Sequence, residues 1–255
     1  MTSATKTSTN SNGILSGGLR HLKESRFALK REKLRRLEKN ELSRYRPYDK
    51  QRRFHDAGAA HRERLFMAGN QLGKTLAGAS EWAMHLTGRY PDWWRGRRFA
   101  RPVRLWAAGV TAESTRDNPQ RMLLGPPQRR DAWGTAALPG DAILSTSAAR
   151  SGADTVDGIV VRHSSGGAST LAFKSYEKGR EKWQGETLDG VWFDEEPPLD
   201  IYSEGLTRTN ATSGMTIITF TPLLGMSEVV RLFLSDSEPD GDTMPADGFT
   251  PGARN

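Results

Sequence analysis

The ten residues F-M-A-G-N-Q-L-G-K-T, at positions 66–75, constrain the fold of this 255-residue chain more than any other segment. An apolar, strand-like run leads into a glycine-rich turn that ends in Gly-Lys-Thr, and an alanine-rich helical pattern follows. Such a turn directs successive backbone N–H groups, and the positive end of the next helix, at an anion. We therefore expect a phosphate-binding loop formed by Ala68, Gly69, Asn70, Gln71, Leu72, Gly73, Lys74 and Thr75.

Two residues of this loop carry the expected chemistry. Lys74 would reach the β- and γ-phosphates of a bound nucleotide, and the Thr75 hydroxyl would hold Mg²⁺. The loop departs from the usual pattern because Ala68 stands where the first glycine is usual and Gly69 comes one residue late. The alternative is a Gly-Lys-Thr sequence in an ordinary surface turn, which the strand before it and the helix after it disfavour.

A second motif, L-D-G-V-W-F-D-E-E at positions 188–196, is an apolar run that ends in acids. A central strand of a parallel sheet is covered on both faces and reads as a continuous apolar run. Its carboxyl end faces the crevice where ligands bind. We expect Asp194 to bind Mg²⁺ and Glu195 to orient and polarise an attacking water. A solvated acidic turn is the alternative, but the upstream phosphate loop has the complementary role in one mechanism.

Apolar runs that alternate with helical patterns predict an α/β fold. With the phosphate loop, they indicate a RecA/ASCE-like P-loop NTPase, with a mainly parallel sheet, helices on both faces and a basic N-terminal helix. The expected strands are 65–68, 103–110, 159–162, 171–173 and 215–221, of which the third and fourth form a hairpin. The expected helices are 74–86, one that starts after Thr111 as N-cap, and 227–234.

Composition excludes several classes of protein. The chain has no cysteine, which rules out disulfides, zinc–thiolate sites and thiol nucleophiles. No apolar run approaches the ~20 residues of a membrane-spanning helix, and the polar N-terminus lacks a signal region, so we expect a cytoplasmic protein. The net charge of +7 is uneven, because residues 1–53 hold 15 Lys and Arg against 5 Asp and Glu. This basic end suits nucleic acid or an acidic protein surface, and a solvated helix is the alternative.

These patterns divide the chain into four expected segments. A polar leader at 1–18 and a Pro/Gly-rich, acidic tail at 235–255 bury little apolar area and are expected to be disordered. A basic helical extension at 19–46 lies between the leader and Pro47, which ends the helix. The P-loop ATPase domain is expected at 47–234.

Three motifs in combination resemble the large subunit of tailed-phage terminases, the DNA-packaging motors. These are A-G-N-Q-L-G-K-T, V-W-F-D-E-E and I-I-T-F-T-P-L-L-G, and the resemblance runs over residues 48–234. It implies that Gln51, in P-Y-D-K-Q, recognises adenine, a role that suits an amide able to donate and accept at once. It also implies a coupling motif at the end of the last strand, at Thr219, Phe220, Thr221 and Pro222.

The chain departs from this family in two respects. Many members carry an arginine within the phosphate loop where this chain has Asn70, so Arg116 and Arg180 are the candidates for an arginine finger, with ordinary surface arginines as the alternative. Family members also carry a C-terminal nuclease domain with a cluster of metal-binding acids. This chain ends 34 residues after Thr221, so we expect no nuclease activity from it.

The resemblance implies a function and a set of partners. We expect a Mg²⁺-dependent ATPase that drives double-stranded DNA into a procapsid. It would act as a homo-oligomeric ring on a portal protein, with a small terminase subunit, in the cytoplasm of an infected or lysogenic host cell. Contacts with DNA would be mainly to phosphates. An arginine-rich segment could face DNA or a partner subunit, or be a surface loop whose tryptophans pack inward: Arg89, Trp93, Trp94, Arg95, Arg97 and Arg98.

Two other functions compete with this one. A helicase-type P-loop ATPase needs a second RecA-like domain, and the Glu-Glu-Pro-Pro sequence at 195–198 is unlike the acid strand of that class. A truncated, non-hydrolysing remnant would bind only DNA or the portal, although all the hydrolytic residues are present. A GTP-specific switch is disfavoured because the chain has no Asn-Lys-x-Asp sequence.

Overall fold

The computed structural model describes residues 24–28, 31, 40–149, 154–222, 227–235 and 252–254. The chain divides into two compact units, residues 1–38 and 39–255. In the first unit, residues 24–28 and residue 31 are helical, within the expected basic helix, and the expected leader lies outside the described residues. The second unit contains the sheet and the predicted site.

The second unit begins earlier than the sequence predicts. The basic helix does not continue to Arg44, because Asn40 is non-helical and caps a separate short helix, α2 (Glu41–Arg44), by accepting the Ser43 N–H at 3.1 Å. Leu42 and Tyr45 are buried in the core of this unit. The boundary therefore lies at residues 38/39 rather than 46/47.

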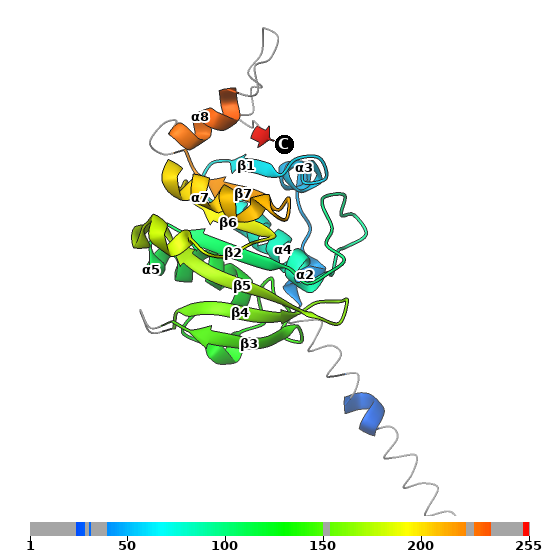
Figure 1. The fold of residues 1–255 in the computed structure, drawn as a ribbon. Helices are drawn as coiled ribbons and strands as arrows, with labels where there is room; N and C mark the ends of the chain where they lie inside the picture. The colour runs from blue at the N-terminus through cyan, green and yellow to red at the C-terminus, as the bar shows by residue number, and fades with distance from the viewer. Residues whose placement is uncertain are drawn as a thin grey trace, which may run out of the picture. The chain divides into compact units, whose positions relative to one another are not determined.

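An eight-stranded sheet forms the centre of the fold, in the order β3-β4-β5-β2-β6-β7-β1-β8 (Figure 1). The strands are β1 (Glu63–Met67), β2 (Arg104–Gly109), β3 (Ile143–Ala148), β4 (Val156–Arg162), β5 (Ala168–Ser175), β6 (Gly190–Asp194), β7 (Met215–Phe220) and β8 (Gly252–Arg254). The five central strands, from β5 to β1, pair in parallel. β3, β4 and β8 pair antiparallel at the edges. The predicted mainly parallel α/β sheet is confirmed.

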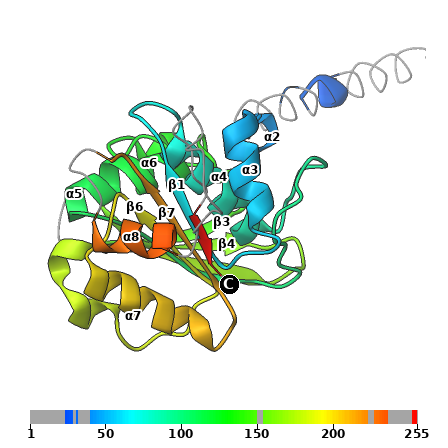
Figure 2. The ribbon, with the colours of Figure 1, turned by 90° about the horizontal axis from the view of Figure 1, so that it is seen from above.

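Helices cover both faces of the sheet, as predicted. The α-helices of the second unit, besides α2, are α3 (Asp49–Ala57), α4 (Lys74–Thr87), α5 (Ala112–Thr115), α6 (Arg121–Leu124), α7 (Leu199–Asn210) and α8 (Glu228–Ser235). Helices α3, α4 and α6 contribute to one buried cluster, and α7 and α8 to the other. Figure 2 shows α7 and α8 together on the side away from α2 and α3. Alternate side chains of β1, β2, β6 and β7 enter the two clusters, which explains the continuous apolar runs.

Short turns complete the fold. They are the π-helical turn η1 (Arg116–Gln120) and the 3₁₀ turns η2 (Arg130–Ala132), η3 (Tyr176–Lys178) and η4 (Arg180–Trp183). The expected N-cap is present, since the Thr111 side chain accepts the Ser114 N–H at 3.0 Å and starts α5.

A close contact between α4 and β6 positions the predicted site. A Cβ added at Gly78 would come within 2.5 Å of the Trp192 ring. Only glycine lets the helix that follows the phosphate loop approach the acid-bearing strand so closely. The contact brings the start of α4 and the end of β6 to the same edge of the sheet.

The end of the chain differs in part from the expected disordered tail. Residues 252–254 form β8 and pair with Glu63, Arg64 and Leu65 of β1, while residues 236–251 lie outside the described part. None of the helices in the described part is long and apolar enough to cross a membrane.

Candidate active site

The predicted phosphate loop lies between β1 and α4, at the carboxyl edge of the parallel strands. Gly73 is the N-cap of α4 with φ of +68°, a left-handed conformation that favours glycine. Lys74 is buried, and its Nζ donates to the Gly69 carbonyl at 2.8 Å. Burial lowers the pKa of Lys74, while Glu195 and Asp194 oppose this shift. The ammonium group is thus held over the loop, beside two acids.

The loop and the acid strand meet directly. The Thr75 hydroxyl donates to Asp194 Oδ1 at 2.9 Å. The Thr219 hydroxyl donates to the same oxygen at 2.8 Å and accepts the Trp192 Nε1–H at 2.8 Å. Burial raises the pKa of Asp194 to about 7, against the two threonine hydrogen bonds that lower it. The geometry therefore joins β6, the phosphate loop and β7 through one carboxylate.

Glu195 has an unusual backbone conformation. Its φ is +69°, which costs energy in a residue with a side chain and often marks functional sites. Its N–H donates to the Thr219 carbonyl at 2.8 Å, and its Oε2 accepts the Thr221 N–H at 3.4 Å. The side chain thus turns from β6 toward the end of β7.

Tyr176 supports both acids and was missed by the sequence analysis. It follows β5, and its buried hydroxyl donates to the carbonyl oxygens of Asp194 at 3.1 Å and Glu195 at 2.8 Å. Burial raises its pKa well above the ordinary value, so the hydroxyl keeps the proton that it donates. A tyrosine directly after an alternating strand pattern, in K-S-Y-E-K, was the available signal.

The predicted coupling residues lie at the end of β7, next to the acids. Thr219 is paired with Asp194 across the sheet and bonded to its carboxylate. Thr221 reaches Glu195 through its backbone rather than its hydroxyl. Phe220 is buried in the core and Pro222 is exposed.

Gln51 lies on the first turn of α3, against the phosphate loop. Its Nε2 donates to the Gly73 carbonyl at 2.8 Å, and its Oε1 accepts the Tyr48 N–H at 3.3 Å. A cavity of about 860 Å³ opens beside it, with Leu72, Leu76 and Met122 among its apolar lining. Sequence reasoning found Gln51 but not Tyr48, whose hydroxyl donates to the Leu72 carbonyl of the loop at 2.5 Å.

Arg116 and Arg180 are engaged away from the loop and the acids. Arg116, on η1, pairs with Asp117 at 2.8 Å, and Arg180, on η4, pairs with Glu204 at 2.9 Å. Within the described residues, no hydrogen bond or ion pair joins either guanidinium to Lys74, Asp194 or Glu195.

The donor groups fit Mg²⁺. The Thr75 hydroxyl and the Asp194 carboxylate are hard oxygen ligands, and they lie within hydrogen-bond distance of each other. No group of three or more His, Cys, Asp or Glu side chains with metal-binding geometry occurs among the described residues. Mg²⁺ in phosphate-transfer sites usually keeps waters and phosphate oxygens as its other ligands, so one carboxylate and one hydroxyl suffice.

The fold and the site together define a P-loop NTPase of the ASCE type, with strand β7 inserted between the loop-bearing β1 and the acid-bearing β6. The family model for the terminase large subunit, T4likevirus-type, N-terminal, matches residues 65–249. The chain belongs to this family.

Two curated relatives support the assignment. The large terminase subunit of Salmonella phage P22 is 46% identical over 212 residues, which cover 76% of this chain and 42% of that protein. The large terminase subunit of Enterobacteria phage LP7 is 46% identical over 52 residues, covering 20% and 11% of the two chains. This chain thus spans less than half the length of these relatives.

A solved structure has the same fold. The Thermus phage P74-26 large terminase ATPase domain superimposes with a TM-score of 0.52 at 20% identity, over 76% of this chain and 72% of that one. A variant of the same domain, in which one arginine is replaced by alanine, gives a TM-score of 0.52 at 22% identity, with the same coverage.

Proposed function

We propose that this chain is the ATP-hydrolysing motor part of a terminase large subunit, and that hydrolysis drives double-stranded DNA into a procapsid. The observation that carries this proposal is the Thr75–Asp194–Thr219 chain of hydrogen bonds. It joins the residues that would hold a nucleotide to the strand end that would respond to it.

Each residue of the site has a separate role in the proposed hydrolysis. The ATP triphosphate lies on the loop, where Lys74 and the backbone N–H groups neutralise its charge. Thr75 and Asp194 would hold Mg²⁺, which would screen the phosphate charge. Glu195 accepts a hydrogen bond from the attacking water and aligns it with the γ-phosphate. The cavity of about 860 Å³ beside the loop would take the adenine base.

The end of β7 transmits the nucleotide state. Thr219 shares the Asp194 carboxylate with Thr75, and the Thr221 N–H contacts Glu195. A change in either acid on phosphate release would therefore shift Thr221 and Pro222. We propose that this shift is coupled to DNA movement in a ring of subunits on a portal protein, with a small terminase subunit, in the host cytoplasm. In such a ring, Arg116 or Arg180 would serve a neighbour's site.

ATP hydrolysis by the purified chain tests the proposal. We expect Mg²⁺-dependent release of phosphate from ATP that increases when portal, small subunit and linear DNA are added. The Lys74→Ala variant should lose at least 100-fold in activity, because it removes the ammonium group that neutralises charge at the phosphates. Wild-type chain without ATPase activity in the complete mixture would favour the non-hydrolysing remnant, and unwinding of a forked duplex would favour a helicase.

A group of arginines at the opposite edge of the sheet is the proposed DNA contact. We define the arginine edge as Arg62, Arg95, Arg97 and Arg98, which lie in segments that precede the parallel strands. Their guanidinium groups donate to backbone carbonyls, namely those of Gly214 (2.9 Å), Asp92 (2.9 Å), Ser213 (2.7 Å) and Trp94 (3.2 Å) respectively. None of the four pairs with a carboxylate in the described part of the chain, so their positive charge is not neutralised.

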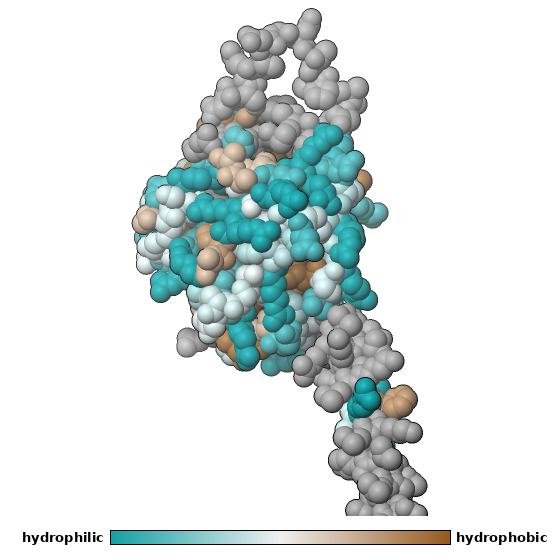
Figure 3. All heavy atoms as spheres, turned by 90° about the vertical axis from the view of Figure 1, so that its right-hand side faces the viewer, coloured by the Kyte–Doolittle hydropathy of each residue, from teal (hydrophilic) through white to brown (hydrophobic). Residues whose placement is uncertain are grey.

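The surroundings of this edge favour an anionic partner. Burial, and next the nearby charge of Arg62, lower the pKa of Arg97, while the Asp189 carboxylate opposes the shift. Trp94 is buried among aromatic residues, so it packs inward, and Arg89 is paired with Asp141 at 2.8 Å. The loop between α4 and β2 lies on the right-hand side of Figure 1, and Figure 3 views the molecule from that side. Hydrophilic residues cover most of this face.

Removing charge from the arginine edge should weaken DNA binding. The Arg95→Ala/Arg98→Ala double variant is expected to lower affinity for duplex DNA and to reduce the slope of log K against log salt by about 2, one for each lost phosphate contact. The effect should not depend on DNA sequence. Arg129→Ala is the control, because Arg129 is equally exposed but paired with Asp131 at 2.7 Å. An equal loss in the control would argue against this surface.

A further inference from the structure

One hydroxyl holds the backbone on both sides of the Glu195 Cα. The Tyr176 hydroxyl is 2.8 Å from the Glu195 carbonyl oxygen and 3.1 Å from that of Asp194. A tyrosine hydroxyl has one proton to donate, so the two oxygens share it. In an extended strand, successive carbonyls point to opposite sides, toward the two neighbouring strands. Two successive carbonyls that converge on one hydroxyl therefore require a turn between them.

The turn lies at Glu195 itself. The Asp194 carbonyl belongs to the planar peptide before the Glu195 Cα, and the Glu195 carbonyl belongs to the peptide after it. Because φ and ψ are the only soft angles between two planar peptides, a donor that holds both carbonyls restricts the two angles together. The φ of Glu195 is +69°, in the left-handed region that costs energy for a residue with a side chain. The Tyr176 hydroxyl offsets part of this cost.

The left-handed conformation decides where the Glu195 side chain points. Phe193 packs with α7 on one face of the sheet, and Asp194 contacts the start of α4 on the other. Successive side chains of an extended strand alternate between faces, so an extended Glu195 would point to the face that α7 covers. Its carboxylate instead accepts the Thr221 N–H at 3.4 Å, at the end of β7. There it also opposes the fall that burial causes in the pKa of Lys74, so it lies beside the phosphate loop.

The position of the Tyr176 hydroxyl is itself fixed by neighbouring elements. Tyr176 is the first residue of η3, and the N–H of the next residue, Glu177, donates to the Val110 carbonyl at 3.1 Å, just after β2. Glu177 Oε1 accepts the N–H of Ala112, the first residue of α5, at 2.6 Å. The Tyr176 ring is buried and packs against Phe193 of β6, with 6.1 Å between the ring centroids. These contacts make the hydroxyl a fixed point against which the end of β6 is set.

We propose that Tyr176 is a positioning residue for the hydrolytic step, which holds Glu195 in the left-handed conformation that turns its carboxylate toward the attacking water. Its hydroxyl acts through two backbone carbonyls and not through the nucleotide. Lys74 and Thr75, which would hold the phosphates and the metal, make their contacts without it. Loss of the hydroxyl should therefore slow the chemical step and leave ATP binding intact. This inference rests on the proposed function, in which Glu195 aligns the water.

Tyr176→Phe tests the proposal, because it removes the hydroxyl and keeps the ring that packs on Phe193. We expect kcat for ATP hydrolysis to fall about 10-fold, the factor by which one lost hydrogen bond can shift an equilibrium between two conformations. KM, and the affinity for a fluorescent ATP analogue, should stay within about twofold. Tyr202→Phe is the matched control, because the Tyr202 ring also packs on Phe193, at 5.8 Å, but its hydroxyl donates to Glu63 at the start of β1. It should leave kcat within about twofold.

A double variant shows whether the hydroxyl acts through Glu195. In a Glu195→Gln background, Tyr176→Phe should have little further effect on the remaining single-turnover rate, because the group that it positions is already gone. The same loss in both backgrounds would overturn the proposal. Wild-type kcat in a folded Tyr176→Phe variant, an equal loss in Tyr202→Phe, or weaker ATP binding that accounts for the lost activity would overturn it too.

A crystal structure of Tyr176→Phe separates this proposal from the proposed function. We expect Glu195 to leave the left-handed region in the variant, and this result does not depend on turnover. A variant that keeps the φ of Glu195 near +69° would overturn the positioning role even if ATP hydrolysis is confirmed. A wild-type chain that binds ATP without hydrolysing it would refute the proposed function, and the structure of the variant would then decide whether Tyr176 holds Glu195.

Discussion

Replacing Glu195 with glutamine is expected to abolish ATP turnover while ATP binding is retained. A general base contributes about 10²- to 10⁴-fold to a rate, and glutamine cannot take up a proton. The substitution preserves shape, and an amide oxygen can still accept the Thr221 N–H, which now contacts the carboxylate at 3.4 Å. The backbone bond from the Glu195 N–H to Thr219 is unaffected. The loss should therefore appear in kcat, with a change in ATP affinity within about threefold.

A neighbouring acid provides the matched control for this measurement. Glu196 follows Glu195 directly, and burial raises its pKa while a backbone N–H of Val230, on α8, opposes the shift. No hydrogen bond joins its side chain to β6 or β7 in the described part of the chain, so Glu196→Gln should retain turnover within about threefold. Phosphate release gives kcat, and a fluorescent ATP analogue gives affinity. Normal turnover in Glu195→Gln, or an equal loss in Glu196→Gln, would reject the assigned role.

The parts of this site that lie in one continuous segment were predictable. The phosphate loop needs a strand, a glycine turn and a helix in succession, and all three occur between residues 63 and 87. The acid strand is equally local, because an apolar run followed by acids marks a central parallel strand and its carboxyl end. The meeting of Thr75 with Asp194 then follows from the architecture, since the carboxyl ends of parallel strands share one edge.

The parts that depend on contacts between distant segments were not predictable. Tyr176 reaches the acids from the end of β5. Its place directly after a strand pattern marks it as a residue at the sheet edge, but its sequence neighbours do not indicate which acids it contacts. The orientation of the arginine-rich segment was not predictable either. Only the structure shows that Trp94 is buried while Arg95 and Arg98 are exposed. The edge strand β8 lies in a Pro/Gly-rich tail whose composition favours disorder, and pairing with β1 outweighs that tendency.

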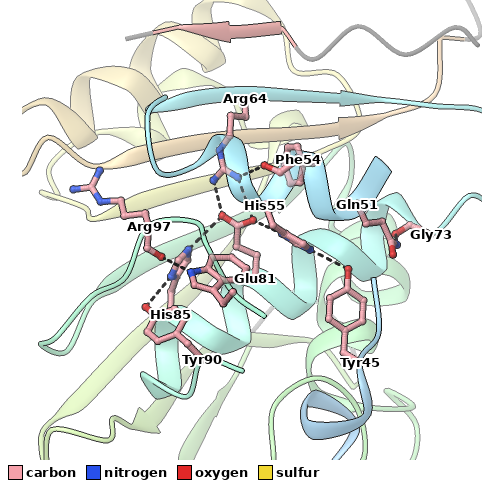
Figure 4. Close-up of polar contacts among 11 residues, drawn as sticks. Tyr45, Gln51, Phe54, His55, Arg64, Gly73, Glu81, His85, Tyr90 and Arg97 are labelled. Carbon is pink, nitrogen blue, oxygen red and sulfur yellow. Dashed lines mark hydrogen bonds and ion pairs between the residues drawn. The ribbon is translucent and has the colours of Figure 1, made fainter. Parts of the chain in front are cut away.

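Removing the Glu81 carboxylate, the centre of the buried network shown in Figure 4, is expected to cost a large share of the stability of the fold. Glu81→Ala leaves the Arg64 guanidinium buried without its partner, and breaking a buried ion pair in this way costs about 3–5 kcal/mol. Burial alone would raise the pKa of Glu81, but Arg64 and the hydrogen bonds of His55 and His85 hold it well below the ordinary value. The ionised network therefore stabilises the fold above about pH 4.3, and this contribution is lost as the pH falls through the lower folded-state pKa.

Urea unfolding of single and double variants measures the loss in the free energy of unfolding and identifies the groups that cause it. Glu113→Ala is the control, because the Glu113 side chain is 78% exposed in its pair with Arg116 and should change stability by less than about 0.5 kcal/mol. Arg64→Met/Glu81→Leu replaces both charges with apolar groups and should recover much of the loss, since a desolvated pair contributes little net energy. If the double variant is as stable as wild type yet binds ATP more weakly, the buried charges serve to place α3 against the phosphate loop. A double variant no more stable than Glu81→Ala alone would show instead that the loss comes from packing around α4 or from the unpaired ring nitrogens of His55 and His85, and not from the unpaired charge of Arg64.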